Sequence, residues 1–596
     1  MARRFRVGVG LLAALGLLGP LAPAASGAEP PAKEPVAVGY GGAVSSVDPD
    51  ATRIGLDVLR RGGTATDAAV ATAAALGVTE PYSAGIGGGG FFVHYDAASG
   101  EVETIDGRET APKAAGEDLL LDENGDPLPF DEAVTSGLGV GVPGTPATWQ
   151  RALDRWGHKS LADVLEPAEE LAREGFVVDQ TFHDQTADNA ERFADFPATR
   201  ELFLPGGKPP EVGSVLRNPD LADTYRAMAR RGTDEIYRGA TAGDIARTVT
   251  DPPVDPAAER DVRPGEMTTG DLADYRALDL EPTHVGYRGY DVYGQAPASS
   301  GGTTVGEALN ILERTDLAAA DEAAYLHRYL ESSKIAFADR NRWVGDPAFS
   351  EVPTAELTGD EFAASRECLI RDDAVLPTPV AAGDPHAPQD CTPRTSGARE
   401  PYEGPNTTHL TTADAYGNVV SYTLTIEQTG GSGMVVPGRG FLLNNELTDF
   451  SFTPNTPGEP DPNLPGPGKR PRSSMSPTIV LRDGKPFVAV GSPGGSTIIT
   501  TALQVLTGRV DRGMTLAQAI AEPRASQRNG EETDAEPGFL AQPEADELKR
   551  LGHRFGTASE IGAATGVELL PDGRWVAAAE PERRGGGSAG VVVPTP

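Results

Sequence analysis

The sequence predicts an α+β protein, because helical and strand-like patterns occupy different parts of the chain. Residues 145 to 360 carry long helical patterns, and the segment 322 to 343 repeats its apolar residues at helical spacing. Beyond residue 406 the pattern changes to short strands joined by tight turns such as Asp483-Gly484. With 596 residues, 39% hydrophobic and 23% charged, the chain is long and apolar enough for a large globular unit.

Residues 1 to 28 have the parts of a secretory signal peptide. Two arginines precede an apolar core at 7 to 18, and Ser26-Gly-Ala28 is a small-residue cleavage site. The alternative is a membrane anchor, but this apolar run is short for a spanning helix and prolines follow it. We therefore expect a secreted, extracellular mature chain that begins at residue 29 and has no membrane association.

The composition argues against some kinds of partner and site. A net charge of -36 disfavours binding to nucleic acid or another polyanion. The 2 cysteines and 8 scattered histidines show no metal-ligand spacing, so we expect neither a metal nor an organic cofactor. Cys368 and Cys391 lie 23 residues apart, and in an exported protein they either form one disulfide or remain two unrelated thiols.

The N-terminal part begins with a predicted strand and two predicted helices. The strand covers 43 to 46, and the first helix, 50 to 61, follows the capping residue Asp48 and stops at Gly62-Gly63. The second helix, 66 to 76, is rich in alanine and largely apolar, which predicts that it is buried.

A glycine run, Gly85-Ile-Gly-Gly-Gly-Gly90, precedes the predicted strand 91 to 95. A phosphate-binding loop is disfavoured, because no Lys-Ser/Thr follows and the next element is a strand. We expect instead that another backbone passes very close to these glycines. The next strand, 101 to 106, ends at Gly107-Arg108, which places an arginine either in a cleft or in a surface salt bridge with Glu109.

The middle of the chain shows the patterns of helices packed in a core, and it shows no catalytic or binding motif. Its apolar residues recur at the spacing of one helix face, which is typical of helices packed against a core. The predicted helices cover residues 145 to 156, 160 to 175, 219 to 231, 241 to 249, 304 to 312 and 322 to 343.

A predicted linker and a predicted strand meet at Thr407. Residues 377 to 405 are rich in Pro, Gly, Ala, Asp and Ser, which predicts a mobile linker. A threonine at such a border can attack the carbonyl of Asn406 and cut the chain, after which its own amine serves as the base for its hydroxyl. On local sequence alone, an ordinary strand threonine is the simpler interpretation.

The next strands, 409 to 412 and 418 to 425, flank a tight turn. If the hairpin is centred on Tyr416, Thr425 lies opposite Thr407 and brings a second hydroxyl beside it. A slip of one residue would turn Thr425 to the other face of the sheet, so this pairing is a hypothesis.

The C-terminal part contains a glycine-rich turn that enters a helix. Gly491-Ser-Pro-Gly494-Gly495-Ser496 leads into the predicted helix 497 to 506, and free N–H groups at such a helix start bind anions. Further strands are predicted at 442 to 445, at 478 to 481, at 486 to 490, and on either side of the turn Asp572-Gly573.

Several short motifs, taken in order, resemble the γ-glutamyltranspeptidase family, also called glutathione hydrolases, over nearly all of the mature chain. The resemblance implies an N-terminal nucleophile hydrolase. The fold it implies is a four-layer αββα sandwich, in which two antiparallel sheets lie between helical layers. It also implies self-cleavage into a large subunit, 29 to 406, and a small subunit, 407 to 596. The motifs are Gly85-Ile-Gly-Gly-Gly-Gly-Phe91, Arg108-Glu-Thr-Ala-Pro112, Pro297-Ala-Ser-Ser-Gly-Gly302, Ala336-Phe-Ala-Asp-Arg340, Thr407-Thr-His409, Leu442-Leu-Asn-Asn445, Lys469-Arg-Pro with Ser473-Ser-Met-Ser-Pro477, and Gly491-Ser-Pro-Gly-Gly495.

The resemblance implies roles for the residues that would carry the chemistry. Thr407 is the implied nucleophile, and Thr425 hydrogen-bonds it. Gly494 and Gly495 are the implied oxyanion hole, in which two N–H groups at a helix start meet the negative charge that develops on the substrate carbonyl.

A γ-glutamyl group carries an α-carboxylate and an α-ammonium, and the resemblance implies residues for both. A guanidinium binds a carboxylate bidentately and serine hydroxyls add donors, whereas acidic side chains bind the ammonium. Relatives often have asparagine where this chain has Glu427, and the loop 451 to 468 lacks the tyrosine that some relatives use as a lid. The implied carboxylate-binding residues are Arg108, Ser473 and Ser474, and the implied ammonium-binding residues are Glu427, Glu446 and Asp449.

The implied activity is that of a γ-glutamyltransferase and glutathione hydrolase. Thr407 would attack glutathione or another γ-glutamyl compound, and water or an acceptor amino acid or peptide would resolve the ester. One alternative is a related acylase of the glutaryl or cephalosporin type, but its acyl group has no ammonium for Glu446 and Asp449 to bind. A remote alternative is a non-catalytic secreted binding protein.

Overall fold

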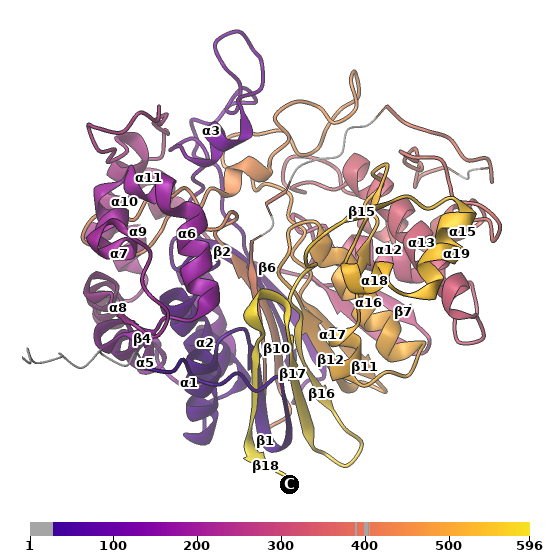
Figure 1. Cartoon of the computed structure of the whole chain (residues 1–596), viewed down its shortest axis with the longest axis horizontal. Coiled ribbons are helices and arrows are strands. Elements are labelled where there is room, and N and C mark those ends of the chain that lie inside the picture. The colour runs from indigo at the N-terminus through magenta and orange to yellow at the C-terminus, as the bar shows by residue number, and fades with distance from the viewer. Residues whose placement is uncertain (1–27, 388–389, 398–402, 405, 596) are drawn as a thin grey trace, which may run out of the picture.

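A computed structural model describes residues 28–387, 390–397, 403–404 and 406–595. The predicted signal peptide therefore lies almost entirely outside the described residues. Within the described part, every helix is too short or too polar to cross a bilayer. The α+β prediction is confirmed, since helices flank a large antiparallel sheet on both sides (Figure 1).

The sheet has 13 strands, and the longest of them, β1, lies near its middle. The first half of β1 pairs with β17, and the second half pairs with β9 and β18. Gly41 and Gly42, with φ of 84° and 126°, allow the bulge between the two halves. The strand order is β6 (Leu278–Leu280), β3 (Glu101–Gly107), β2 (Gly89–Asp96), β10 (Val419–Thr425), β9 (Thr408–Asp414), β1 (Val36–Ser46), β17 (Trp575–Ala579), β16 (Thr565–Leu569), β12 (Lys485–Gly491), β11 (Thr478–Arg482), β8 (Tyr290–Gly294) and β7 (Thr283–Tyr287), with β18 (Ser588–Pro594) on β1.

Two groups of helices cover this sheet from opposite sides (Figure 1). The first group includes α1 (Pro49–Arg60), α2 (Ala65–Thr79), α4 (Thr145–Trp156), α5 (Leu161–Glu174), α6 (Gln180–Ala194), α8 (Pro219–Arg231) and α10 (Ala240–Thr250). The second group includes α12 (Gly301–Glu313), α13 (Glu322–Trp343), α15 (Asp360–Glu367), α16 (Thr497–Val510), α17 (Leu516–Ala521) and α19 (Pro543–Leu551).

The apolar core consists of three large clusters. One packs the first helical group against β9 and β10, as the burial of Tyr422 and Leu424 shows. A second packs α12, α13 and α16 against β8, β11 and β12. The third contains strand residues such as Ala413, Val567 and Trp575 and therefore joins the two halves of the sheet to each other.

The predicted helices agree with the structure wherever local signals are strong, and one predicted strand is wrong. The predicted buried helix is α2, in which every residue is buried. The strand predicted at 442 to 445 is reduced to a single bridge between Val435 and Leu442. Its asparagines bond to backbone groups through their side chains instead, and the short 3-10 helix η2 (Glu446–Asp449) follows.

The expected close approach at the glycine run is confirmed. A Cβ atom on Gly87 would lie 2.0 Å from the carbonyl oxygen of Leu442, and one on Gly88 would lie 2.0 Å from that of Thr425. Only glycine fits between these backbones. The run therefore presses directly against the end of β10, where Thr425 lies.

Cys368 and Cys391 form a disulfide, so the two thiols are paired. The described parts of the predicted linker contact the body of the protein. Val380 is buried, its N–H donates to Oδ1 of Asn529 at 2.7 Å, and it bridges to Thr395. The mobility of the linker remains a prediction.

Candidate active site

Thr407 lies directly before β9 and faces Thr425, the last residue of β10. Within this hairpin Leu424 pairs with Thr408, which is the predicted register. The next step along both strands brings Thr425 opposite Thr407, and their side-chain oxygens lie 3.3 Å apart. The predicted pairing is therefore confirmed, and the slipped register is wrong.

Hydroxyl groups surround the carbonyl of Asn406. Oγ1 of Thr407 lies 2.5 Å and Oγ1 of Thr425 lies 3.0 Å from the carbonyl oxygen. The backbone N–H of Glu427 donates to Oγ1 of Thr425 at 2.9 Å, which fixes that hydroxyl in place. The carbonyl is thus polarised beside a hydroxyl that can attack it.

The side chain of Asn406 anchors the same peptide bond. Its Oδ1 accepts from Oγ of Ser83 at 3.0 Å and from the guanidinium of Arg584, and its Nδ2 donates to the carbonyl of Tyr82 at 2.6 Å. Arg584 also donates to the carbonyl oxygen of Thr407 at 2.7 Å. A single arginine therefore holds both sides of the Asn406–Thr407 bond.

A small cavity opens beside Thr407. Its volume of about 20 Å³ leaves room for about one water molecule. Nearly all the predicted site residues line it, and Gly494 lies just outside the lining. The lining consists of Arg108, Glu403, Gly404, Asn406, Thr407, Thr425, Glu427, Glu446, Asp449, Ser473, Ser474, Met475, Gly495 and Ile498.

Gly494 and Gly495 form the turn that enters α16. Their φ values of 133° and 56° are rarely adopted by other residues. A Cβ atom on Gly495 would lie 2.2 Å from the carbonyl oxygen of Gly404, so the segment before Thr407 passes directly over this turn. The structure brings the predicted oxyanion turn to the same cavity as Thr407.

Arg108 is buried between two acidic side chains. Its guanidinium forms ion pairs with Glu446 and with Asp449, the second at 2.5 Å. It also donates to the carbonyl oxygens of Pro471 at 3.1 Å and Arg472 at 2.8 Å. These bonds engage most of its N–H groups. In the intact chain, Arg108, which is predicted for the substrate carboxylate, is therefore paired with Glu446 and Asp449, which are predicted for its ammonium.

Acidic groups outnumber Arg108 at this end of the cavity. Burial raises the pKa of Glu446 to about 8 and that of Asp449 to about 6, although the charge of Arg108 acts to lower both pKa values. Burial, with repulsion from Asp449 and Glu446, raises the pKa of Glu427 well above its usual range. Oε2 of Glu446 and Oδ1 of Asp449 are buried without a hydrogen-bond partner among the described residues. This surplus of buried acceptors favours the binding of a cation with N–H donors.

The two predicted serines have different partners. Oγ of Ser474 donates to the carboxylate of Glu403 and accepts from the guanidinium of Arg340 at 2.8 Å. Oγ of Ser473 accepts from the N–H of Met475 at 3.2 Å. Both serines line the cavity.

Three residues at the site, Glu403, Arg340 and Arg584, were assigned no role from the sequence. Arg340 belongs to the motif Ala336-Phe-Ala-Asp-Arg340, so its sequence context was a signal. Glu403 lies in the predicted linker, where an isolated acid is unremarkable. Arg584 contacts Thr407, which lies 177 positions earlier in the sequence, and the local sequence around Arg584 does not indicate that contact.

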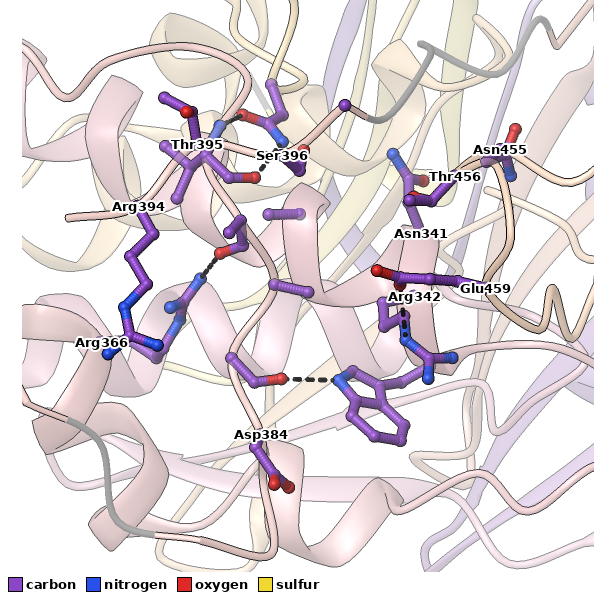
Figure 2. Close-up of a pocket in the computed structure, with 18 of the residues that line it drawn as sticks. Asn341, Arg342, Arg366, Asp384, Arg394, Thr395, Ser396, Asn455, Thr456 and Glu459 are labelled. Carbon is purple, nitrogen blue, oxygen red and sulfur yellow. Dashed lines mark hydrogen bonds and ion pairs between the residues drawn. The ribbon is translucent and has the colours of Figure 1, made fainter.

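A larger cavity of about 980 Å³ lies beside the C-terminal end of α13 (Figure 2). Nε1 of Trp343 donates to the carbonyl of Gly383 at 2.8 Å along one wall, and Arg342 pairs with Glu459 at 3.4 Å. None of the predicted site residues is among the described residues that line it. The predicted site residues therefore gather at the smaller cavity beside Thr407.

Comparisons with known proteins identify the family of this chain. A family model described as gamma-glutamyltranspeptidase matches residues 51–590. The glutathione hydrolase proenzyme of Bacillus subtilis (strain 168) is 40% identical over 540 residues, which cover 90% of this chain and 89% of that protein. The glutathione hydrolase proenzyme of Escherichia coli (strain K12) is 37% identical over 574 residues, which cover 94% of each protein.

A solved structure is similar to this chain over nearly its whole length. The crystal structure of cephalosporin acylase from Bacillus halodurans has a TM-score of 0.82 at 29% sequence identity, covering 97% of this chain and 99% of that one. Because the family model and both hydrolase relatives span most of the sequence, the chain belongs to the γ-glutamyltranspeptidase family.

Proposed function

We propose that this enzyme is a secreted γ-glutamyltransferase and glutathione hydrolase that cuts its own chain between Asn406 and Thr407. The observation that carries the proposal is the hydroxyl of Thr407, which lies 2.5 Å from the carbonyl oxygen of Asn406. Both relatives described above are named glutathione hydrolase proenzymes, which supports the activity and a precursor form.

Self-cleavage turns one amide into an ester and then into two chain ends. Oγ1 of Thr407 adds to the carbonyl carbon of Asn406, the hydroxyl of Thr425 stabilises the oxygen that becomes negative, and the nitrogen of Thr407 leaves as an amine. Water then hydrolyses the ester. The products are a large subunit, 29–406, and a small subunit, 407–596.

The new chain end carries out the donor reaction. The α-amine of Thr407 has an ordinary pKa of about 7.7–8.0, so near neutral pH it can accept the hydroxyl proton. Thr407 then forms a γ-glutamyl ester and releases Cys-Gly from glutathione, and water or an acceptor amino acid or peptide takes the γ-glutamyl group. Gly494 and Gly495 donate N–H groups to the oxyanion, and losing one such donor typically costs roughly 100–1,000-fold in rate.

The charge distribution supports a donor with an α-ammonium. Glu446 and Asp449 face the cavity, each with one oxygen that has no hydrogen-bond partner among the described residues, and Glu427 adds a third acid. Arg108 balances only part of this charge. An α-ammonium would supply the missing positive charge and N–H donors, and Arg108, Ser473 and Ser474 remain the proposed partners of the α-carboxylate.

An acylase of the glutaryl or cephalosporin type is the second candidate, favoured by the structural match to a cephalosporin acylase. A glutaryl group carries no ammonium, so the acids of the cavity would have only Arg108 to balance them, which is costly for buried charges. A preference for glutaryl-p-nitroanilide over γ-glutamyl-p-nitroanilide would therefore favour the acylase. A non-catalytic secreted binding protein, the remote alternative, would stay intact and turn over neither compound.

We also propose that the sheet bends at β1 into two stacked halves, which would complete a four-layer αββα sandwich. The bulge at Gly41 and Gly42 and the change of pairing partner along β1 support the bend. The cluster that contains Ala413 and Trp575 would fill the space between the halves.

Two measurements on purified protein test the proposal. N-terminal sequencing of the small fragment is expected to read Thr-Thr-His, and the protein is expected to release p-nitroaniline from γ-glutamyl-p-nitroanilide. Thr407→Ala is expected to remain one chain without this activity. A variant that still cuts itself, or an intact wild-type chain with full activity, would contradict the mechanism.

A further inference from the structure

His409 lies two residues after Thr407, so its ring is a candidate for a catalytic base. Thr407 directly precedes β9, and His409 is the second residue of that strand. Because side chains alternate along a strand, both side chains point to the same face. His409 is fully buried, however, and it is not among the described residues that line the cavity beside Thr407.

Both ring nitrogens of His409 are engaged in hydrogen bonds. Nδ1 lies 2.8 Å from Oγ1 of Thr423, the residue that pairs with His409 across the hairpin. Nε2 lies 3.5 Å from Oγ of Ser421, and that hydroxyl donates to the carbonyl oxygen of Val490 at 3.2 Å. Since Ser421 gives its hydrogen to Val490, it accepts one from Nε2, and Nδ1 then accepts from Thr423. Neither nitrogen is left to take a proton from Thr407.

The ring is neutral and packs directly on Gly491, the last residue of β12. Burial lowers the pKa of His409 to about 3, so the ring carries no charge near neutral pH. A Cβ atom on Gly491 would lie 2.3 Å from Cε1, 2.5 Å from Nδ1 and 2.7 Å from Nε2 of the ring. The ring therefore lies over the Cα atom of Gly491, where only glycine fits.

Gly491 begins the oxyanion turn, the segment 491–496 that carries Gly494 and Gly495. Only two residues separate Gly491 from Gly494. The first of them, Ser492, is fixed in place, because its Oγ accepts from the N–H of Ala563 at 3.0 Å. A displacement of Gly491 would therefore move the N–H groups of the turn.

We propose that His409 is a positioning residue for the donor reaction, because its ring sets the distance between the strand that follows Thr407 and the oxyanion turn. The inference rests on the proposed function, since it assigns the support of the turn proposed to stabilise the oxyanion. His409 acts through Gly491 and not on the reacting atoms. Self-cleavage depends instead on the hydroxyl of Thr425, so the two reactions are expected to respond differently to this contact.

Gly491→Ala tests the proposal with γ-glutamyl-p-nitroanilide as the donor. The added methyl group must displace the ring or the turn by about 1 Å, and a misplacement of that size costs roughly 100-fold in rate. In the cleaved protein kcat is expected to fall roughly 100-fold, while KM changes less than about twofold, because the lost interaction is made only in the transition state. The rate of self-cleavage, measured as conversion into two fragments, is expected to stay within about threefold of the wild type.

A second substitution separates this contact from a general loss of structure. His409→Ser removes the ring, so Gly491→Ala with His409→Ser has room for the methyl group and is expected to recover at least about tenfold of the lost kcat. Gly286→Ala is the matched control, because a Cβ atom on this glycine of β7 meets no described atom within 4 Å. The control is expected to keep the wild-type kcat.

His409→Ser alone distinguishes positioning from general-base catalysis. Its kcat is expected to fall about tenfold, because the turn loses its support. The midpoint of the pH profile of kcat is expected to stay at the wild-type value, and added imidazole is expected to restore no activity, because the ring takes no proton. A shifted midpoint or recovery with imidazole would identify His409 as the base and overturn the proposal.

The glycine variant gives three further results that would overturn it. These are a wild-type kcat in Gly491→Ala, no recovery when His409→Ser is added, and a joint loss of self-cleavage and turnover. A cleaved wild-type protein that does not hydrolyse γ-glutamyl-p-nitroanilide would instead refute the proposed function.

Discussion

Thr425 lies directly across the β9–β10 hairpin from Thr407, with their side-chain oxygens 3.3 Å apart. The same hydroxyl of Thr425 lies 3.0 Å from the carbonyl oxygen of Asn406. One side chain therefore contacts both the attacking group and the group that is attacked. Self-cleavage is expected to depend on it, because it is the hydroxyl that meets the developing negative charge.

Thr425→Val is expected to slow self-cleavage roughly 100–1,000-fold, since it removes the donor to that carbonyl while keeping the shape of the side chain. The measurement is the rate at which intact protein converts into two fragments on a denaturing gel. Thr423→Val is the control, because Thr423 lies on the same strand but bonds to Nδ1 of His409. Equal cleavage rates for the two variants would contradict a direct role of Thr425.

Asn406→Ala is expected to slow self-cleavage roughly 100-fold. It removes the bonds from Ser83 and Arg584 and the bond to the carbonyl of Tyr82, each of which contributes about 1 kcal/mol. Donor turnover per cleaved molecule is expected to change much less than the cleavage rate. A variant that cleaves at the wild-type rate would show that this anchor is dispensable.

The sequence predicted those parts of the fold that have local causes. The helices α4, α8 and α13 have the predicted bounds, because their helical spacing and their start signals are local: a proline in the first turn of α4 and of α8, and the capping residue Asp321 before α13. β1 was predicted only in part, since its first half is glycine-rich and pairs with β17 more than 500 positions away. The polar α6 was missed because it buries only three side chains, Phe182, Thr186 and Phe193.

The residues of the candidate site also divide into those with a local sequence signal and those without one. Thr407 lies where the composition of the predicted linker changes to a strand pattern, and the position of Thr425 follows from the hairpin register. The hydrogen bond from Arg584 to Asn406 joins residues 178 positions apart, and the position of Glu403 depends on how its segment folds back over Gly495. Such contacts are set by tertiary packing, so no local pattern predicts them.

The disulfide between Cys368 and Cys391 is expected to stabilise the protein by about 3 kcal/mol, because it closes a short loop and restricts the unfolded chain. Chemical denaturation of Cys368→Ser with Cys391→Ser, against the wild type, measures this difference. Addition of a reductant is expected to lower the stability of the wild type and to leave the double variant unchanged. Equal stability of all samples would contradict the prediction.

Donor binding is expected to weaken as the pH falls from about 8 to about 6. Burial raises the pKa of Glu446 to about 8 and that of Asp449 to about 6, so acidification across this window protonates both groups. Protonation removes the negative charge that attracts the donor's α-ammonium. The KM of γ-glutamyl-p-nitroanilide therefore rises as the pH falls, whereas that of glutaryl-p-nitroanilide, which has no ammonium, does not.

The variant Glu446→Gln separates the two titrating groups. Glutamine keeps the shape of the side chain but does not titrate, so the rise in KM near pH 8 should disappear while the rise near pH 6, due to Asp449, persists. KM and kcat must be measured separately, because the amine of Thr407, with an ordinary pKa of about 7.7–8.0, lowers kcat over the same range. Glu101→Gln, an exposed acid of β3, is the control and should keep the wild-type profile. A KM of the wild type that stays constant across this window would show that neither acid binds the ammonium.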